Sequence, residues 1–257
     1  MKIGVCIKCV PATDEIIRIN QSGKDIDNAN LKYIINPYDE FAIEEALKIR
    51  DKHSGTEVII ICVGNEDNKE HIRLALAMGC DRGVLIKPET STSILKDSYL
   101  IATQISKVVK KEGITLLITG KIAIDHNNGH VSSMLAAILD WSQAINVNQI
   151  EIKEDKLVVV KEIDNAEKIK IELALPTVLG ISKGLNQPRY PTIINLMKAK
   201  SKLIEEYQID SIDLKQVEIE KFTYQKQKRE CIFIDNKDIE KTCEELVTCL
   251  KLKEKII

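Results

Sequence analysis

The chain has 257 residues, a length that suits one large α/β domain with an appended arm. Its apolar fraction of 44%, charged fraction of 30%, net charge of -2 and aromatic fraction of 4% indicate a globular protein and argue against nucleic-acid or anionic-lipid binding. No apolar run reaches the length of a membrane span and no signal peptide opens the chain, so we expect a cytoplasmic protein without direct membrane insertion.

Strand-like runs recur along the first half of the chain. Short, continuous apolar runs typical of strands covered on both faces occur at residues 2–8, 57–63, 83–86 and 115–120, and residues 16–27 indicate an irregular hairpin. Helical patterns separate these runs. The alternation of strand and helix predicts a parallel sheet with right-handed crossovers.

The helices between these strands carry start and stop signals. Asn36 is a good N-cap residue and Pro37 suits the first helical position, so a helix should begin there. A second helix, over residues 71–79, should end at Gly79. A third is marked by apolar residues from Ile94 to Val108 and should stop at Gly113, and a fourth should run from residue 132 to 139.

The second half of the chain changes character. Alternating patterns at 150–164 and 168–175 predict antiparallel strands added to the sheet, and an apolar run follows at 177–181. Breakers fill residues 182–192, a basic stretch covers 197–202, and the chain is polar and weakly patterned from about 205. A last helix carries a narrow stripe of Ile239, Cys243, Leu246 and Leu250.

These patterns define the fold class as α/β, with a doubly wound, mostly parallel, Rossmann-like sheet, added antiparallel strands and a C-terminal helical arm. We expect residues 1–204 to form the nucleotide-binding domain and residues 205–257 the arm.

Cysteines and histidines do not form a metal pattern. The seven cysteines lie mostly in apolar runs, which favours buried free thiols in a reducing compartment. Cys6 and Cys9 have C-x-x-C spacing, but no helix opens after them and no second pair exists for zinc. His126 and His130 lack a third ligand nearby. We therefore expect no metal site.

Polar residues at the strand ends suggest where a ligand binds. In an open parallel sheet, ligands bind beyond the carboxyl ends of the strands, here at 6–10, 63–64 and from Gly120 onward. The small, polar residues 125–130 lead into a helix start at Ser132 and Ser133, which suits a phosphate cradle. An ordinary loop with a serine N-cap fits the pattern equally well. No catalytic motif is present, which favours a carrier or binding module over a self-sufficient enzyme.

Several longer motifs identify a family. VCIKCVP near the start, INPYDEFAIEEAL at 35–47, IRLALAMGCDRG at 72–83 with TGKIAID at 119–125, and LNQPRYPTIINLMKAK at 185–200 resemble the β subunit of electron transfer flavoproteins over essentially the full length. Residues 159–176 correspond to the family's signature strand pair. The resemblance implies an adenine-nucleotide alpha hydrolase-like fold.

The resemblance also implies a nucleotide in the switch-point site, which is AMP in the common type of the family. Family contact positions correspond to Cys6, Asn36, Pro37, Asp39, Val63, Gly120, Lys121, Ile122, Ala123, Ile124, Asp125, His126, Asn127, Asn128, Gly129, His130 and Val131, followed by Ser132 and Ser133 of the cradle. Tyr38 and Glu162 match positions near an FAD that lies between the subunits and is held mainly by the α subunit.

The resemblance further implies partners. An α subunit would complete a heterodimer and contact the arm, and flavin dehydrogenases such as acyl-CoA dehydrogenases would donate electrons. A docking loop at 185–200 would present Tyr190, Ile193, Ile194 and Met197, with Ile193 at the position of the family's anchoring leucine.

Two alternatives stay open at this point. A bifurcating-type β subunit would bind a second FAD and oxidise NADH. The chain departs from both types, with His126-Asn127-Asn128 and Val131-Ser132-Ser133 in the nucleotide loop, while ALAMGCDRG, ILDW and LNQPRY favour the AMP type. A stand-alone adenine-nucleotide sensor shares the four-strand core but has no use for residues 185–200 or the arm.

Overall fold

The computed structural model describes residues 1–88, 97–153, 156–163, 167–208, 217, 219–224, 233–234 and 238–254. It divides into two compact units, Met1–Glu220 and Lys221–Ile257, and each is described by itself. Within the described residues, no helix is both long and apolar enough to cross a membrane.

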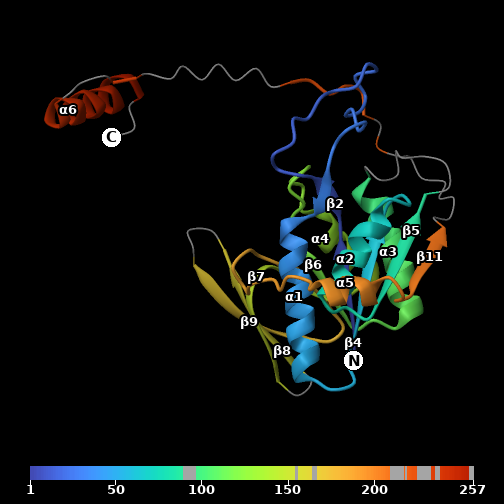
Figure 1. Cartoon of the computed structure of the whole chain (residues 1–257). Coiled ribbons are helices and arrows are strands. Elements are labelled where there is room, and N and C mark those ends of the chain that lie inside the picture. Colours follow the sequence, from blue (N-terminus) through green and yellow to red (C-terminus); the bar gives the residue numbers. More distant parts are fainter. Residues whose placement is uncertain are drawn as a thin grey trace. The chain divides into compact units, whose positions relative to one another are not determined.

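A mostly parallel sheet forms the centre of the first unit, as the sequence predicts (Figure 1). In the described part of the chain its order is β11-β5-β4-β1-β6-β10-β7-β8-β9, and every neighbouring pair from β11 to β7 is parallel. The parallel strands are β1 (Lys2–Ile7), β4 (Glu57–Val63), β5 (Arg82–Lys87), β6 (Leu116–Gly120), β7 (Ser142–Lys153), β10 (Thr177–Ile181) and β11 (Ile204–Gln208).

The antiparallel extension begins on β7. The first half of this strand pairs with β10 in parallel, and its second half pairs in the antiparallel sense with β8 (Lys156–Glu162), which pairs with β9 (Lys168–Ala174). A register shift near Val147 marks the change of partner. The predicted antiparallel strands are therefore confirmed.

Helices cover both faces of the sheet in Figure 1. One core contains side chains of α1 (Pro37–Lys52) and α2 (Asn68–Met78), and α5 (Ile193–Ala199) packs on α2. The other core contains α3 (Ser98–Glu112) and α4 (His130–Leu139). Because strands β1, β4, β6 and β10 are covered on both sides, their apolar runs are almost entirely buried.

Helix boundaries follow the predicted stop signals better than the start signals. Gly79 and Gly113 end α2 and α3 with positive φ values of 135° and 66°. However, α2 begins three residues before the predicted start at residue 71, and α4 begins at His130 rather than at residue 132. Asp97 caps α3, and Ile94 of the predicted third helix lies outside the described residues.

A small hairpin adjoins the carboxyl end of β1. Strand β2 (Cys9–Pro11) pairs with β3 (Tyr33–Ile35), and an Ile19–Ile26 bridge lies within the predicted hairpin at 16–27. The backbone N–H of Asn36 donates to the Lys8 carbonyl at 2.9 Å. This contact brings the start of α1 next to the end of β1.

The edge strand β11 was not predicted, since residues from 205 onward were expected to belong to the arm. Two successive side chains of this strand, which point to opposite faces of the sheet, both form ion pairs. Glu205 pairs with Arg82, while Glu206 contacts Lys69 and Lys87. Polar residues are tolerated here because an edge strand is only half covered.

The second unit contains a helix that buries none of its side chains within this structure. Helix α6 (Ile239–Cys249) is followed by a π-helical turn, Leu250–Glu254. Its exposed apolar residues include Ile239, Leu246 and Val247. The predicted final helix is thus present, with an amphipathic surface.

Candidate nucleotide site

The strand order reverses at the carboxyl end of β1, and we call the region there, between Lys8, the start of α1 and the loop after β6, the crevice. This strand lies between β4 and β6, so the chain runs outward to β4 and β5 before returning to β6 on the other side. Ligands of open α/β sheets bind where the strand order reverses in this way. The β2–β3 hairpin and the start of α1 lie at this same edge (Figure 1).

Asn36 and Asp39 tie the start of α1 to both sides of the crevice. Asp39 Oδ2 accepts a hydrogen bond from the Lys8 N–H at 2.8 Å, and Oδ1 accepts from the Gly120 N–H at 3.1 Å and from Asn36 Nδ2 at 2.9 Å. Asn36 Nδ2 also donates to the Ile122 carbonyl. Asn36 occupies the N-cap position as predicted, but its side chain makes these bonds instead of a capping bond.

This arrangement is tightly packed. Burial raises the pKa of Asp39 to about 7, even though three donors surround its carboxyl group. A Cβ atom on Gly120 would lie 2.4 Å from Asp39 Oδ1 and 2.7 Å from Tyr38 Cβ. Only glycine therefore allows the end of β6 to approach the first turn of α1 this closely.

Lys8, Asp125 and His126 form a charged group at the mouth of the crevice. Lys8 Nζ lies 2.6 Å from Asp125 Oδ2 and 3.2 Å from His126 Nδ1. Burial raises the pKa of Asp125, but hydrogen bonds from His126 and Lys8 outweigh this effect and hold the pKa well below its usual range. The crevice thus carries a lysine ammonium that is already oriented by a carboxylate.

The amino end of α4 completes the site. Gly129 is the N-cap with φ of 64°, and no side chain caps the helix. Because the first N–H groups of a helix have no intrahelical acceptor, this end can receive an anion. Ser132 lies inside the first turn of α4 and is therefore not the N-cap. Its buried hydroxyl lies 2.6 Å from the Thr119 hydroxyl on β6.

The remaining predicted contact residues lie in β1, at the end of β4, at the start of α1, in the loop after β6 and in the first turn of α4. Cys6 is buried in β1, where burial raises the pKa of its thiol and Asp39 adds to the effect. Val63 ends β4, and the Ile124 N–H donates to Asn36 Oδ1 at 3.3 Å. Pro37, Lys121, Ala123, Asn127, Asn128, His130, Val131 and Ser133 occupy the start of α1, the loop after β6 and the first turn of α4.

The two residues predicted to lie near a flavin are connected through two others. Lys121 Nζ lies 5.5 Å from the centre of the Tyr38 ring and donates to Asn146 Oδ1 at 3.3 Å. Asn146 Nδ2 donates to the Glu162 carbonyl at 2.8 Å. Lys121 and Asn146 therefore connect the Tyr38 ring to the backbone of Glu162, although the two residues lie far apart in the sequence.

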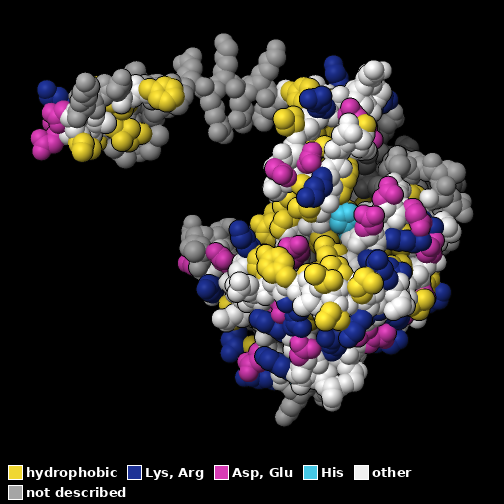
Figure 2. Space-filling model, in the orientation of Figure 1, with side chains coloured by type: hydrophobic (Ala, Val, Ile, Leu, Met, Phe, Trp, Pro, Cys, Tyr) yellow, Lys and Arg dark blue, Asp and Glu magenta, His cyan; other side chains and the backbone are white. Residues whose placement is uncertain are grey.

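The predicted docking loop contains a short helix with an exposed apolar surface. Tyr190 is 92% exposed and Ile193 is 81% exposed, and Ile194 and Met197 are also exposed. We call these residues the docking surface. Figure 2 shows hydrophobic side chains gathered over the position of α5. Within α5 only Ala199 is buried.

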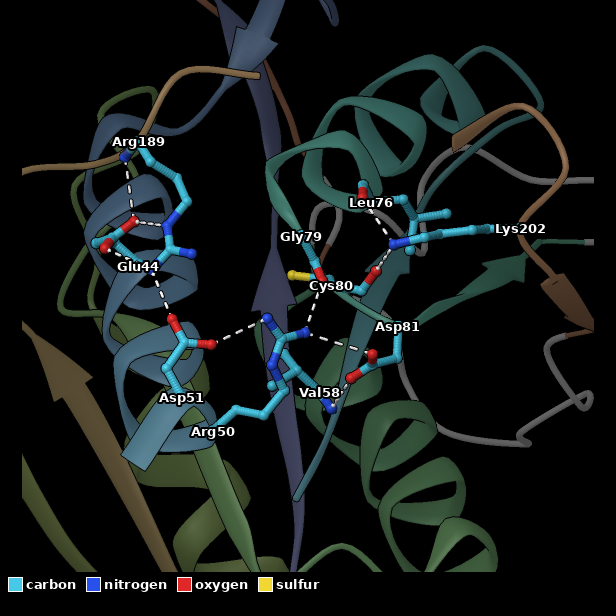
Figure 3. Close-up of polar contacts among 10 residues, drawn as sticks. All are labelled: Glu44, Arg50, Asp51, Val58, Leu76, Gly79, Cys80, Asp81, Arg189 and Lys202. Carbon is cyan, nitrogen blue, oxygen red and sulfur yellow. Dashed lines mark hydrogen bonds and ion pairs between the residues drawn. The ribbon is translucent and has the colours of Figure 1, made fainter. Parts of the chain in front are cut away.

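Polar contacts hold both ends of the docking segment to the domain (Figure 3). Before α5, Arg189 makes two side-chain hydrogen bonds to the Glu44 carboxylate, at 2.8 and 3.0 Å, and one to Asp51 at 3.2 Å. After α5, Lys202 Nζ donates to the carbonyls of Leu76 and Cys80. The exposed surface is therefore presented by a fixed support.

Sequence reasoning missed several residues of these sites. Lys8 is the last residue of the first predicted strand, at 2–8, and its place at a strand end is the signal that could have identified it. Asn146 was missed because it lies in the first part of β7, before the predicted strand pattern at 150–164, and no pattern indicated its φ of 66°. Arg189 was part of a breaker-rich loop, and nothing local indicates that it reaches Glu44.

Other possible sites lie away from this crevice. In the described part of the chain, no three His, Cys, Asp or Glu side chains are grouped so that they could hold a metal ion. One hollow of about 390 Å³ lies near Met1 and Pro176, and another of about 510 Å³ lies between α1 and the antiparallel strands. Neither is lined by a predicted site residue.

Comparisons with known proteins agree with this architecture. A family model described as electron transfer flavoprotein domain matches residues 25–212. The chain is 37% identical over 206 residues to electron transfer flavoprotein subunit beta of Bradyrhizobium diazoefficiens, covering 80% of this chain and 81% of the relative. The Bacillus subtilis relative of the same name is 37% identical over 221 residues, with coverage of 86% and 84%. The human one is 35% identical over 205 residues, with 80% of each chain covered.

Proposed function

The chain belongs to the electron transfer flavoprotein family, in its β-subunit group, and on that premise we propose that it forms a heterodimer with an α subunit. The heterodimer accepts electrons from flavin dehydrogenases, such as acyl-CoA dehydrogenases, on an FAD held mainly by the α subunit. It then passes them to a further acceptor. This chain is a carrier subunit rather than a self-sufficient enzyme.

We propose that the crevice holds AMP as a structural ligand. The observation that carries this proposal is the uncapped start of α4 beside Lys8, since backbone N–H groups and a cation suit a phosphate. Because the backbone of Gly120 approaches α1 closely, backbone groups would form this part of the nucleotide site. The N–H groups at 130–132 and Lys8 would hold the phosphate, and the loop after β6 would hold the nucleoside.

A second FAD is the alternative ligand of this crevice. Extraction of the nucleotide from the purified protein, followed by mass spectrometry, distinguishes the two. An ultraviolet-only adenine spectrum for the isolated β subunit supports AMP, and a yellow isolated subunit supports the bifurcating type.

A matched pair of variants tests the phosphate position. Proline at the first helical position is tolerated but removes one N–H, so His130→Pro should lose more nucleotide than His130→Ala. His130 is preferable to Ser132, whose hydroxyl contacts Thr119. Equal nucleotide content in both variants, measured by absorbance after extraction, would contradict the placement even if the family assignment stands.

We propose that Tyr38 and Glu162 form this subunit's wall of the flavin site. The link through Lys121 and Asn146 supports the proposal because it holds both residues on one surface. The bound flavin supplies the electron-accepting and electron-donating group. Tyr38 and Glu162 would determine the shape and the charge of the flavin's surroundings on this subunit.

We propose that the docking surface binds the dehydrogenase, with Ile193 as the anchor. An exposed side chain that enters a partner's pocket can contribute about 2 kcal/mol, which corresponds to roughly a 30-fold change in affinity. Ile193→Ala should therefore lower the rate of electron transfer at limiting dehydrogenase. Nucleotide content, flavin content and heterodimer stability should stay as they are.

Leu203→Ala is the matched control, because Leu203 is also an exposed aliphatic residue but lies outside the docking surface. Equal rates for the Ile193 and Leu203 variants would refute the anchor.

A further inference from the structure

Strand β7 contains two extra residues at the point where it changes partners. Asn146 lies between the two residues of β7 that pair with consecutive residues of β10, so it has no partner there. Asn148 likewise lies between the two residues that pair with Lys161 and Val160 of β8. Each is a β-bulge, a feature that bends a strand and redirects a side chain, often next to a functional site.

Together the two bulges keep an apolar face of β7 on the core. Ala144 and Val147 are buried in one core and Ile150 packs against it, each three residues after the last. A regular strand returns to the same face every second residue, so from Ala144 it would direct Asn146 and Asn148 into this core. The first bulge places Val147 there instead, and the second restores the alternation for Ile150. The bulges therefore leave Asn146 free for other contacts.

Asn146 uses both ends of its side-chain amide. Its Oδ1 accepts a hydrogen bond from Lys121 Nζ at 3.3 Å, and its Nδ2 donates to the Glu162 carbonyl at 2.8 Å. Lys121 Nζ in turn lies 5.5 Å from the centre of the Tyr38 ring. The backbone of Asn146 has a φ of 66°, which glycine adopts at lower cost. The backbone conformation alone therefore does not explain an asparagine here, whereas the two hydrogen bonds require its amide.

The second bulge differs from the first in both respects. Asn148 does not have a positive φ, and its buried Oδ1 has no hydrogen-bond partner among the described residues. It is the same residue type, two positions along the same strand, without the bridging contacts of Asn146. Asn148 is therefore a matched control for the contribution of the Asn146 amide.

We propose that Asn146 is a positioning residue for the flavin wall, an inference that rests on the wall of Tyr38 and Glu162 proposed above. Its amide oxygen holds the Lys121 ammonium beside the Tyr38 ring, and its amide nitrogen holds the end of β8 through the Glu162 carbonyl. One cation and one carboxylate thus keep fixed positions on this surface. Because the energy of a charge depends on its distance from other charges, their placement affects how readily a bound flavin accepts electrons.

The first test needs no flavin and measures the rate at which Lys121 of the full chain is acetylated, resolved by peptide mass spectrometry. Asn146→Gly permits the same backbone conformation but lacks the amide. Lys121 should then react about 2- to 10-fold faster than in the wild type, the factor for the loss of one hydrogen bond, because its amine is no longer held. In Asn148→Ala it should react at the wild-type rate. Equal rates in the wild type and Asn146→Gly would overturn the proposal.

The second test compares the midpoint potential of the flavin in heterodimers by spectroelectrochemistry. Asn146→Gly and Glu162→Gln should both shift the potential, while Asn148→Ala should keep the wild-type value. If Glu162→Gln shifts the potential and Asn146→Gly does not, the positioning role is wrong and the flavin wall stands. If neither variant shifts it, the flavin wall itself is refuted, and the positioning role with it.

Discussion

The contact between Glu44 and Arg189 predicts an asymmetry between its two deletions. The Glu44 side chain is 5% exposed, whereas that of Arg189 is 38% exposed and also reaches Asp51. Arg189→Ala leaves a buried carboxylate without its guanidinium. Glu44→Ala leaves a guanidinium that water and Asp51 still stabilise.

The expected magnitudes follow from burial. Removing one partner of a buried ion pair costs about 3–5 kcal/mol, so Arg189→Ala should cost about 3 kcal/mol, at the lower end because the guanidinium is partly exposed. Glu44→Ala should cost about 1–2 kcal/mol, similar to the loss of hydrogen bonds to a charged group. Asp51→Ala is the matched control, and because Asp51 is 48% exposed it should cost less than about 1 kcal/mol.

Urea unfolding of the four chains and of the Arg189/Glu44 double variant measures these values. The double variant should cost less than the sum of the single variants, with a coupling of about 1–3 kcal/mol. The reasoning would be refuted if Glu44→Ala cost as much as Arg189→Ala, or if the coupling were below about 0.5 kcal/mol.

Further variants test the crevice, the fold and the interface. Asp39→Asn should release nucleotide and lower the Tm by about 5 °C or more in calorimetry, because the amide cannot accept from three buried donors. Arg82 lowers the pKa of Glu112, so this carboxylate stabilises the fold above its unfolded pKa and the effect is lost as the pH falls through the folded value. Glu112→Gln should therefore be less stable at neutral pH but lose less stability on acidification in urea titrations. Glu162→Gln should shift the flavin potential, and an unchanged potential would indicate an ordinary strand residue. Removal of residues 235–257 should weaken heterodimer assembly in gel filtration while the circular dichroism of the remaining chain is retained.

The elements that depend on local pattern could be predicted from the sequence. In the run EVIIICV at 57–63 every residue after Glu57 is apolar, and such a run is typical of a strand buried on both faces. Gly79 and Gly113 stop their helices because glycine accepts the left-handed backbone region without cost. The rule that ligands of open parallel sheets bind beyond the carboxyl ends of the strands then predicts a region for a ligand site without any knowledge of the strand order.

The elements that depend on distant partners could not be predicted in the same way. Strand β10 inserts between β6 and β7, although it follows them by several elements. Ser132 has the pattern of an N-cap, yet its hydroxyl contacts Thr119 across the crevice. Edge strand β11 is polar because Arg82 and Lys87 of the neighbouring β5 pair with it. In each case a tertiary contact outweighs a local preference.

Helix α1 contacts all three of the features proposed for the first unit. Adjacent helical residues point about 100° apart, so Tyr38 and Asp39 face different neighbours. Asp39 binds the end of β1 and the Gly120 N–H, while Tyr38 lies under Lys121 on the flavin wall. Farther along, Glu44 holds Arg189 before the docking surface. Different side chains of one helix therefore contact the proposed nucleotide crevice, the proposed flavin wall and the proposed docking segment.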